Sequence, residues 1–357
     1  MTRGVIVKAR ILTTLKEADV RKFIGIDLHS NNCVVVVSDE EDRVLLKQRV
    51  PNALSEIVSM LAPHREEAVG VVVESTYNWY WLVDGLMDAG YPVHLANPSA
   101  IKKYEGLKYS GDFADAAYLA QVLRLGLLAE GYIYPREERA ARDLARKRMQ
   151  LVRYCTAQIL SIEIIVARQT GGRMKNEVIK RLTAEQVEAL GFAPDVTLAV
   201  ESNRAVSQVL QQQIEALEKR LKERVNLRPE YRLLKTAPGI GETLATTIML
   251  ETGTVARFAK VGNCSSYCRC VDSLRESNGK KKGEGNTKNG NKYLAWAFVE
   301  AANFALRYCP EAKRFYERKK RTTNGIVAIK ALAHKLARAC YHVLREQKPF
   351  EVKRCFA

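Results

Sequence analysis

Long hydrophobic runs are missing from this chain of 357 residues. No apolar stretch approaches the ~18 residues that a bilayer-spanning helix needs, and the N-terminal residues lack the apolar segment of a signal peptide. Both absences argue against a membrane protein and against a secreted one. We therefore expect a cytoplasmic protein.

Cysteine is sparse and scattered, with eight residues in the whole chain. So few, spread so widely, do not suggest a disulfide framework, and in the cytosol they should be reduced. Only Cys264, Cys268 and Cys270 cluster, and they have neither a fourth ligand nor C-x-x-C spacing. We interpret them as buried structural thiols in preference to a zinc site.

Acidic residues are too few to balance the basic ones. The chain has 57 lysines and arginines against 40 aspartates and glutamates, a formal net charge of +17. Such an excess indicates a polyanionic partner. Nucleic acid is the commonest such partner, and an anionic membrane surface is the lesser alternative.

The first third of the chain alternates strand and helix patterns. β-branched runs predict strands over residues 22–28, 33–38, 43–50, 68–74 and 91–95, and apolar periodicity predicts helices over 52–63, 78–89, 98–104 and 112–129. This order predicts an α/β mixed sheet with helices packed over it. It is the order of the ribonuclease H-like (RuvC-like) core, in which the first strand, the fourth strand and a late helix converge on one cleft.

Four carboxylates fall on those three elements. Asp27 and Glu74 each close a predicted buried strand, while Asp112 and Asp115 lie three apart and share one helix face. Four negative charges in one cluster are unstable unless cations neutralise them. Two Mg²⁺ ions about 3.5–4 Å apart, with Mn²⁺ able to substitute, would do so and could drive phosphodiester chemistry. The alternative for Asp115 alone is a cap or ion pair within its own helix.

Long helical patterns follow over residues 137–168 and again up to about residue 225. Their heptad-like spacing suits an antiparallel hairpin or a coiled-coil seam between protomers, and equally a spacer packed within one chain. The composition changes again after Pro229, where mainly helical patterns continue. We predict a nuclease domain over residues 1–134, a helical coiled-coil region over 135–229 and a C-terminal domain over 230–357.

Two stretches of the C-terminal third are candidates for nucleic-acid contact. Residues 233–243 look like the hairpin of a helix-hairpin-helix motif, in which Gly239 and Gly241 would let backbone amides approach a phosphate; a tight turn between core helices is the alternative. Residues 273–292 have no apolar side chain after Leu274, which predicts a solvated or nucleic-acid-facing loop. The lysines available to phosphates there are Lys280, Lys281, Lys282, Lys288 and Lys292.

Several motifs together resemble one known family. Residues 25–30 (GIDLHS), 73–76 (VEST) and 112–116 (DFADA) resemble the DEDD transposases of insertion-sequence family one-ten. Residues 238–241, 275–280 and 289–294 resemble the second domain of that family, and their sequences look closest to its eleven-eleven branch. The resemblance runs from about residue 22 to 346, and the middle helices match in character only.

The resemblance implies a recombinase that moves its own element in a prokaryotic cytosol, associated with the nucleoid. It implies a RuvC-like domain, a coiled-coil region and a C-terminal transposase domain, guided by a structured bridge RNA that pairs with donor and target DNA. Asp27, Glu74, Asp112 and Asp115 would be magnesium ligands, and Ser277 the catalytic serine that forms a covalent phosphoserine. Asn278 stands where many relatives have glycine, so Ser273 is the second choice. The metal site of one protomer would work with the serine of another, which implies a dimer or tetramer.

Two other functions fit parts of the sequence. A RuvC-type endonuclease or junction resolvase would use water as the nucleophile and leave Ser277 structural. An actin-like ATPase or sugar kinase also closes its first strand on Gly-x-Asp. However, His29 and Ser30 stand where such a protein needs a glycine and a hydroxyl residue, and its second phosphate loop is not found.

Overall fold

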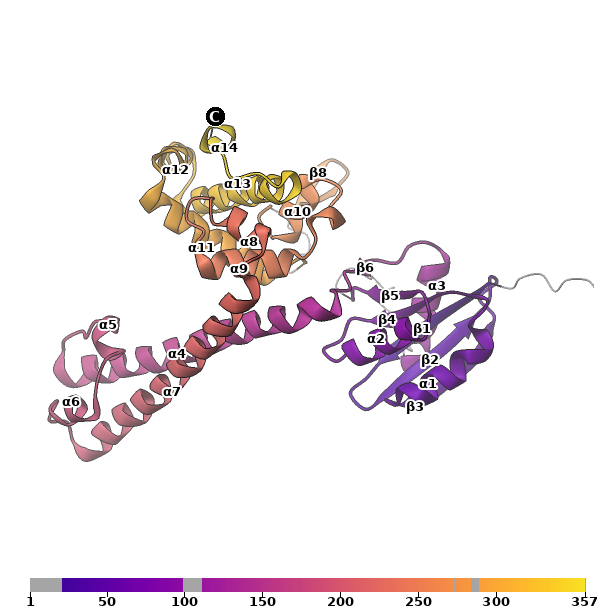
Figure 1. Cartoon of the computed structure of the whole chain (residues 1–357), viewed down its shortest axis with the longest axis horizontal. Coiled ribbons are helices and arrows are strands. Elements are labelled where there is room, and N and C mark those ends of the chain that lie inside the picture. The colour runs from indigo at the N-terminus through magenta and orange to yellow at the C-terminus, as the bar shows by residue number, and fades with distance from the viewer. Residues whose placement is uncertain (1–20, 99–110, 272–273, 284–288, 357) are drawn as a thin grey trace, which may run out of the picture. The chain divides into compact units, whose positions relative to one another are not determined.

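The computed structural model describes residues 21–98, 111–271, 274–283 and 289–356 (Figure 1). The chain divides into two compact units, Met1–Ile133 and Tyr134–Ala357. The further division expected at residue 229 stays a prediction. The short helix predicted over 98–104 falls almost wholly outside the described residues, as do Ser273 and Lys288.

A six-stranded mixed sheet forms the centre of the first unit, in the order β3-β2-β1-β4-β5-β6. Its strands are β1 (Lys22–Leu28), β2 (Asn32–Ser38), β3 (Val44–Pro51), β4 (Ala68–Glu74), β5 (Val93–Ala96) and β6 (Glu130–Gly131). β1 pairs antiparallel with β2 and parallel with β4. The five predicted strands are confirmed. β6 was not predicted because two residues carry no alternating pattern.

Helices cover both faces of this sheet. Ile24, Ile26 and Leu28 of β1 pack in one core with residues of α1 (Leu54–Leu61), which is followed by the short η1 (Ala62–His64), and of α2 (Tyr80–Asp88). The opposite face is covered by α3 (Asp112–Arg124). The prediction that α3 reaches residue 129 was wrong, because the chain leaves the helix at Gly126 with a φ of +67°.

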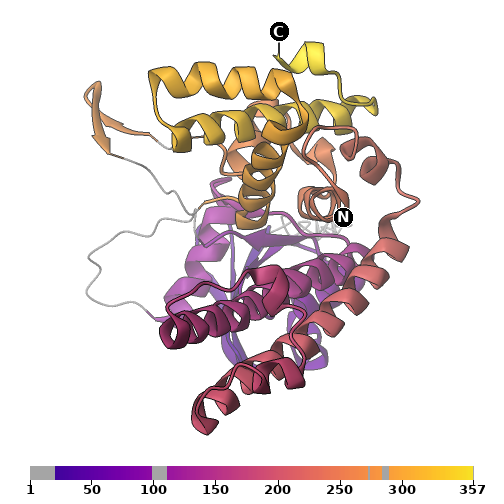
Figure 2. The same ribbon diagram turned by 90° about the vertical axis from the view of Figure 1, so that its left-hand side faces the viewer.

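The second unit begins with two long helices, α4 (Arg136–Thr170) and α7 (Pro194–Val225), which lie side by side in both views (Figure 1, Figure 2). The contacts run antiparallel: Cys155 lies near Ser207, and Arg148 binds Glu218. Short helices α5 (Asn176–Ile179) and α6 (Ala184–Glu188) lie between them in sequence. The two long helices therefore pack against each other within one chain. By length and composition alone α4 could cross a membrane, which is weak evidence for a single helix; one face of it, with Ile159, Ile162 and Val166, packs in the α4–α7 core.

A helical core completes the second unit. Its elements are α8 (Pro229–Leu234), α9 (Glu242–Thr252), η2 (Val255–Arg257), α10 (Val261–Tyr267), the hairpin β7 (Arg275–Ser277) and β8 (Lys280–Gly283), α11 (Lys292–Tyr308), α12 (Pro310–Thr322), α13 (Gly325–Glu346) and α14 (Val352–Phe356). Small buried residues such as Ala297, Ala301 and Ala305 let α11 approach α13 and α9. Cys264 and Cys268 are buried free thiols of this core.

Candidate active site

Asp27 and Glu74 end neighbouring parallel strands. Ile26 of β1 is in register with Val73 of β4, so the next residues, Asp27 and Glu74, lie at the same carboxyl edge of the sheet. Side chains alternate between the faces of a strand. Gly25 and Val72 face α3, and so Asp27 and Glu74 lie on the α3 face as well.

Close packing of α3 on β1 brings Asp112 to this edge. A Cβ on Gly25 would lie 1.9 Å from the carbonyl oxygen of Ala116, so only glycine permits the approach. From that contact, two residues along β1 to Asp27 cover about 6.6 Å, and one helical turn back along α3 to Asp112 covers about 6 Å. Asp27 and Asp112 therefore meet, although they are far apart in the sequence.

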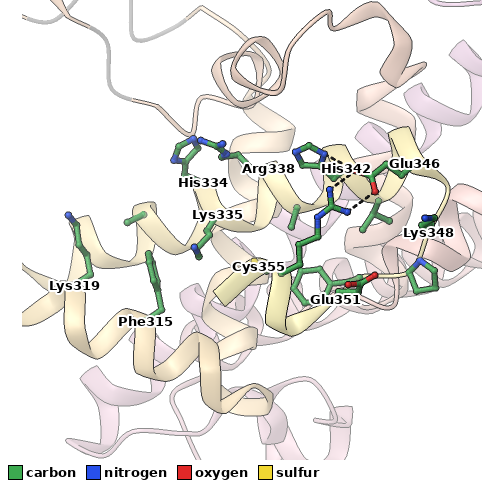
Figure 3. Close-up of a pocket in the computed structure, with 16 residues that line it drawn as sticks. Phe315, Lys319, His334, Lys335, Arg338, His342, Glu346, Lys348, Glu351 and Cys355 are labelled. Atoms are coloured by element: carbon green, nitrogen blue, oxygen red, sulfur yellow. Dashed lines mark hydrogen bonds and ion pairs between the residues drawn. The ribbon is translucent and has the colours of Figure 1, made fainter. Parts of the chain in front are cut away.

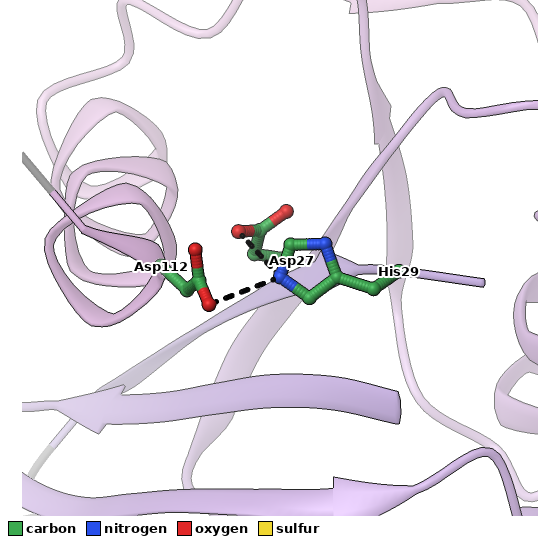
Figure 4. Close-up of side chains that lie close together, drawn as sticks. All are labelled: Asp27, His29 and Asp112. Carbon is green, nitrogen blue, oxygen red and sulfur yellow. Dashed lines mark ion pairs between the residues drawn. The ribbon is translucent and has the colours of Figure 1, made fainter. Parts of the chain in front are cut away.

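His29 completes a cluster with these two acids, the acidic cluster Asp27–His29–Asp112 (Figure 4). One ligand atom from each side chain lies within 4.8 Å of the other two. The imidazole Nε2 is 3.5 Å from Oδ2 of Asp27 and 3.4 Å from Oδ2 of Asp112. This nitrogen is buried and has no hydrogen-bond partner among the described residues. A buried nitrogen that faces two carboxylates and makes no hydrogen bond to a described residue is the arrangement of a cation-binding group.

The backbone around His29 is fixed by neighbouring loops. The side-chain amides of Asn52 and Asn78 donate to the carbonyl oxygen of His29 at 3.1 and 3.0 Å, and the His29 amide donates to the carbonyl of Asn32 at 2.9 Å. Sequence reasoning left His29 out of the site. The signal that could have found it is its spacing of two from Asp27, which in extended chain places both on one face.

The acidic cluster carries the carboxylates of Asp27 and Asp112, and one cation, Arg49, already binds one of them. Nη2 of Arg49 on β3 donates to Oδ2 of Asp112 at 2.5 Å, and this hydrogen bond lowers the pKa of Asp112 below its ordinary value. Cys33 lies on β2, next to β1. Its burial, and secondarily the negative charge of Asp27, raise the Cys33 pKa to about 12.

The acidic cluster suits one divalent cation, since carboxylate oxygens are the ligands that Mg²⁺ and Mn²⁺ prefer and imidazole is a common nitrogen ligand. Two of the four predicted acids, Asp27 and Asp112, lie in this group of mutually close side chains. Glu74 occupies the adjacent strand end and Asp115 the same helix face one turn later, both outside the group as found among the described residues. A second ion stays a prediction.

Ser277 lies at the end of β7, next to a two-residue turn. It is exposed and pairs with Lys280 of β8. Asn278 and Gly279 have φ values of 50° and 68°, as in a type I′ hairpin turn, which favours Asn-Gly. The segment predicted as a loop is thus in part a β-hairpin. Asn278 fits because asparagine tolerates the left-handed region better than other non-glycine residues.

Comparisons with known proteins agree with both halves of this description. Residues 24–167 match the profile of IS110-type DEDD transposases, and residues 231–317 match the transposase IS116/IS110/IS902 family. The transposase for insertion sequence element IS1328 from Yersinia enterocolitica is 24% identical over 343 residues, covering 92% of this chain and 98% of the relative.

The chain belongs to the IS110 family of transposases. The first matched region contains all four predicted acids, and the second contains Ser277. Membership confirms the resemblance to insertion-sequence family one-ten. The finer assignment to the eleven-eleven branch stays a prediction.

In this IS110-family transposase, the segment that carries Ser277 is held together at its base. The guanidinium of Arg269 donates to the carbonyl of Gly290 at 3.1 and 2.8 Å, and the amide of Asn291 donates to the carbonyl of Tyr267 at 2.6 Å. The Asn291 side chain also caps α11 by accepting from the amides of Tyr293 and Leu294. The residues that flank the segment 270–289 on its two sides therefore lie next to each other.

A buried carboxylate supports this base and was missed by sequence reasoning. Glu251 of α9 is 1% exposed. Its carboxylate accepts two hydrogen bonds from Arg146 of α4, at 2.6 and 2.7 Å, and one from the side-chain amide of Asn291 at 2.7 Å. Its backbone carbonyl accepts from the hydroxyl of Tyr134. The group ties α4, α9 and the start of α11 into one polar network.

The two glycines predicted to contact a phosphate have different surroundings. Gly239 has a φ of +81°, and a Cβ there would lie 2.1 Å from the carbonyl oxygen of Ala301, so its close approach is to α11. Gly241 is exposed at the start of α9 and has open space beside it. Glu242, which binds Lys222 and Lys235, already places a negative charge at that helix end. Phosphate contact at either glycine stays a prediction.

Proposed function

We propose that this IS110-family transposase cuts and rejoins DNA strands, using a divalent metal site in the first unit and the hydroxyl of Ser277 in the second. The observation that carries the proposal is the convergence of Asp27, His29 and Asp112 at one edge of the sheet. Three ligand-type side chains from two distant segments, one with a buried nitrogen that makes no hydrogen bond to a described residue, are hard to explain by stability alone.

Asp27 and Asp112 would hold the metal, with His29 as a nitrogen ligand and with Glu74 and Asp115 completing the site for Mg²⁺ or Mn²⁺. When bound, a divalent cation polarises the scissile phosphate and offsets the charge that develops on its oxygens. Metal binding at Asp112 would compete with Arg49, whose guanidinium now binds the same carboxylate oxygen. Release of Arg49 would leave a cation beside the phosphate, where it could stabilise the transition state.

Ser277 would act as the nucleophile. Its Oγ forms a bond to phosphorus, the bond from phosphorus to the oxygen of the departing strand end breaks, and the serine proton ends on that oxygen. The DNA phosphate is then held as a phosphoserine ester, so a hydroxyl of another strand can displace it without an external energy source. The exposed position of Ser277 beside the turn at Asn278 and Gly279 leaves it open to a backbone phosphate.

The partners we propose are donor and target DNA and a structured bridge RNA that pairs with both, acting in the cytoplasm. The net charge of +17 and the exposed Lys280, Lys281 and Lys282 support a polyanionic partner. The acids and Ser277 lie on separate compact units of one chain. We propose a homo-oligomer, a dimer or a tetramer, in which the metal site of one protomer serves the serine of another.

The direct test is detection of a covalent protein–DNA adduct on a denaturing gel, with labelled element-end DNA, the guide RNA from the flanking sequence and Mg²⁺. We expect Asp27→Ala and Ser277→Ala each to lose the adduct. Asp88→Ala, an exposed acid of α2, serves as the control and should retain it. Retention by both site variants would overturn the proposal.

Hydrolysis by water is a second candidate, and one observation favours it. All three side chains of the acidic cluster come from the first unit, so a metal nuclease site needs no residue of the second. A Ser277→Ala protein that still cuts DNA at the wild-type rate, with no adduct formed by the wild type, would select this alternative. The ATPase or sugar-kinase alternative is set aside by membership of the transposase family.

A further inference from the structure

A cavity of about 620 Å³ lies at the C-terminal end of the second unit, between α12, α13 and residues 348–355 (Figure 3). Its volume falls in the range of about 300–1,000 Å³ that is usual for small-molecule sites. Phe315 and Lys319 reach it from α12, and α13 contributes side chains along most of its length. Neither the acidic cluster nor Ser277 belongs to this basic cavity.

Cations of the basic cavity are left without counterions. Among the residues described by the structure, Lys319, Lys335, Arg338 and Lys348 have no ion-pair partner. The carboxylate of Glu346 is already used, since it accepts from Arg354 at 2.6 and 2.7 Å. Glu351 is the other acid that lines the cavity, and lysines and arginines still outnumber the two acids there. Like charges gathered around one hollow repel each other, and an anionic ligand would relieve this.

Titration of a histidine in the cavity agrees with a positive potential. Burial, and then the charge of Arg338, lower the pKa of His334 below its ordinary value. His334 and Arg338 lie one turn apart on α13. The wall of the cavity is therefore both partly shielded from water and positively charged, the setting in which a phosphate is bound strongly.

The floor of the cavity is apolar and aromatic. Phe315 and Phe350 line it, and both pack against Phe356, with ring centroids 6.2 and 6.5 Å away. Nζ of Lys335 lies 5.2 Å from the centroid of the Phe315 ring. An aromatic surface beside unpaired cations is the arrangement by which proteins bind unpaired nucleotides, with the base on the ring and the phosphate on the cations.

We propose that the basic cavity binds one unpaired nucleotide of a nucleic-acid strand, with its base against Phe315 and its phosphates against Lys335, Arg338 and Lys348. A base inside a duplex is stacked and paired, so only an unpaired nucleotide can reach a concave apolar floor. The inference rests on the proposed function only in that both need a nucleic-acid partner. DNA and RNA strands share this chemistry.

The first test removes the phosphate-binding charges. Binding of a labelled 20-nucleotide single strand to the full chain is measured without divalent metal over a range of salt concentrations. Each phosphate contact on a single strand contributes about 0.7 to the slope of log K against log salt. Lys335→Gln/Arg338→Gln should therefore lower the slope by about 1.4. The control Lys175→Gln/Lys180→Gln removes the same charge from exposed positions beside α5 and should leave the slope unchanged.

The second test removes the stacking surface. Phe315→Leu should weaken single-strand binding about tenfold and leave binding of the matching duplex unchanged. Tyr154→Leu removes an exposed ring of α4 outside the cavity and is the control. Unchanged thermal melting of Phe315→Leu is required, and Phe315→Tyr, which keeps a ring, should retain wild-type affinity. Wild-type binding by both cavity variants, or equal losses for duplex and single strand, would overturn the inference.

To distinguish a DNA from an RNA nucleotide, binding is compared between single strands of the same sequence made as DNA and as RNA. A larger loss with RNA assigns the cavity to the guide, and a larger loss with DNA assigns it to a displaced DNA strand; equal losses assign it to either. None of these measurements depends on cleavage. If no adduct forms through Ser277 but the cavity variants lose binding, the proposed cleavage mechanism is wrong and the proposed role of the cavity is supported. If the adduct forms but the cavity variants bind like wild type, the mechanism is supported and the role of the cavity is wrong.

Discussion

The acidic cluster of the first unit and the basic cavity of the second gather charge in opposite ways. Asp27 and His29 come from the end of β1 and Asp112 from the start of α3, and their ligand atoms converge within 4.8 Å. The cations of the cavity are spread out, with Lys335 and Arg338 three residues apart on α13 and others on α12 and in the segment after α13. Convergence within a few ångströms suits a single metal ion, whereas spaced charges suit the successive phosphates of a strand.

The two sites also differ in what positions their side chains. In the acidic cluster, the register of β1 and β4 and the contact at Gly25 fix the side chains, so small backbone changes should disrupt it. In the cavity, long flexible side chains on exposed helices supply the charge, so single substitutions there should alter binding without unfolding the protein. The Glu251 network is the exception in the second unit, because it is buried.

Glu251→Gln should give the largest loss of stability. The substitution leaves the guanidinium of Arg146, which now makes two hydrogen bonds to the carboxylate and is only partly exposed, without a compensating charge. Removing one partner of a buried ion pair costs about 3–5 kcal/mol. Chemical denaturation should show this loss. Glu188→Gln, at an exposed position at the end of α6, is the control and should change stability little.

Gly25→Ala should come next, with a loss of about 2–3 kcal/mol, since overpacking without room to relax costs that much. The added Cβ would lie 1.9 Å from the Ala116 carbonyl, so α3 must move away from β1. That movement separates Asp112 from Asp27. Mn²⁺ affinity, measured by calorimetry, should therefore fall together with the free energy of unfolding. Gly111→Ala has nothing within 4 Å of its new Cβ and should preserve both. Equal stability of the two alanine variants would contradict the packing account.

Two of the three residues of the acidic cluster, Asp27 and Asp112, could be predicted, in part because strand patterns carry register information. A β-branched run closed by an acid locates a strand end, and parallel neighbours bring such ends together, as Asp27 and Glu74 show. Asp112 could be placed on a helix, but its distance from Asp27 depends on the glycine contact at position 25. That contact is visible only in three dimensions.

Glu251 and α12 could not be predicted for different physical reasons. Glu251 is a single acid in a buried helix, and its partners Arg146 and Asn291 lie 105 and 40 residues away, so no local pattern links them. In α12 the cations of PEAKRFYERKKRT outnumber the apolar residues, which hides the helical periodicity behind Ala312 and Phe315. Long-range polar pairing and strongly charged amphipathic helices leave little trace in hydrophobic spacing.

Asn278→Val should have a smaller, local effect on the Ser277 hairpin. Asn278 has a φ of 50°, a conformation that costs a β-branched residue roughly 1–2 kcal/mol. Asn278→Gly relieves this cost and is the control. We expect the valine variant to lose hydrogen-exchange protection in residues 275–283 and to form adduct more slowly, with global stability unchanged. A valine variant as protected as the glycine variant would argue against the type I′ turn.

The smallest effect expected is a pH-dependent loosening of α14 beside the basic cavity. Hydrogen bonds from Arg354, and then from His342, lower the pKa of Glu346 from 4.5 to about 2. Because the folded-state pKa is depressed, the stabilisation is fully present above about pH 4.5 and is lost as the pH falls toward 2. Hydrogen exchange of residues 352–356 should therefore be faster in Glu346→Gln than in wild type at neutral pH, and the two should converge as the pH approaches 2. Glu317→Gln removes an exposed acid from α12 and should follow wild type throughout; a difference that persists at low pH would show that the Glu346 carboxylate does not hold α14.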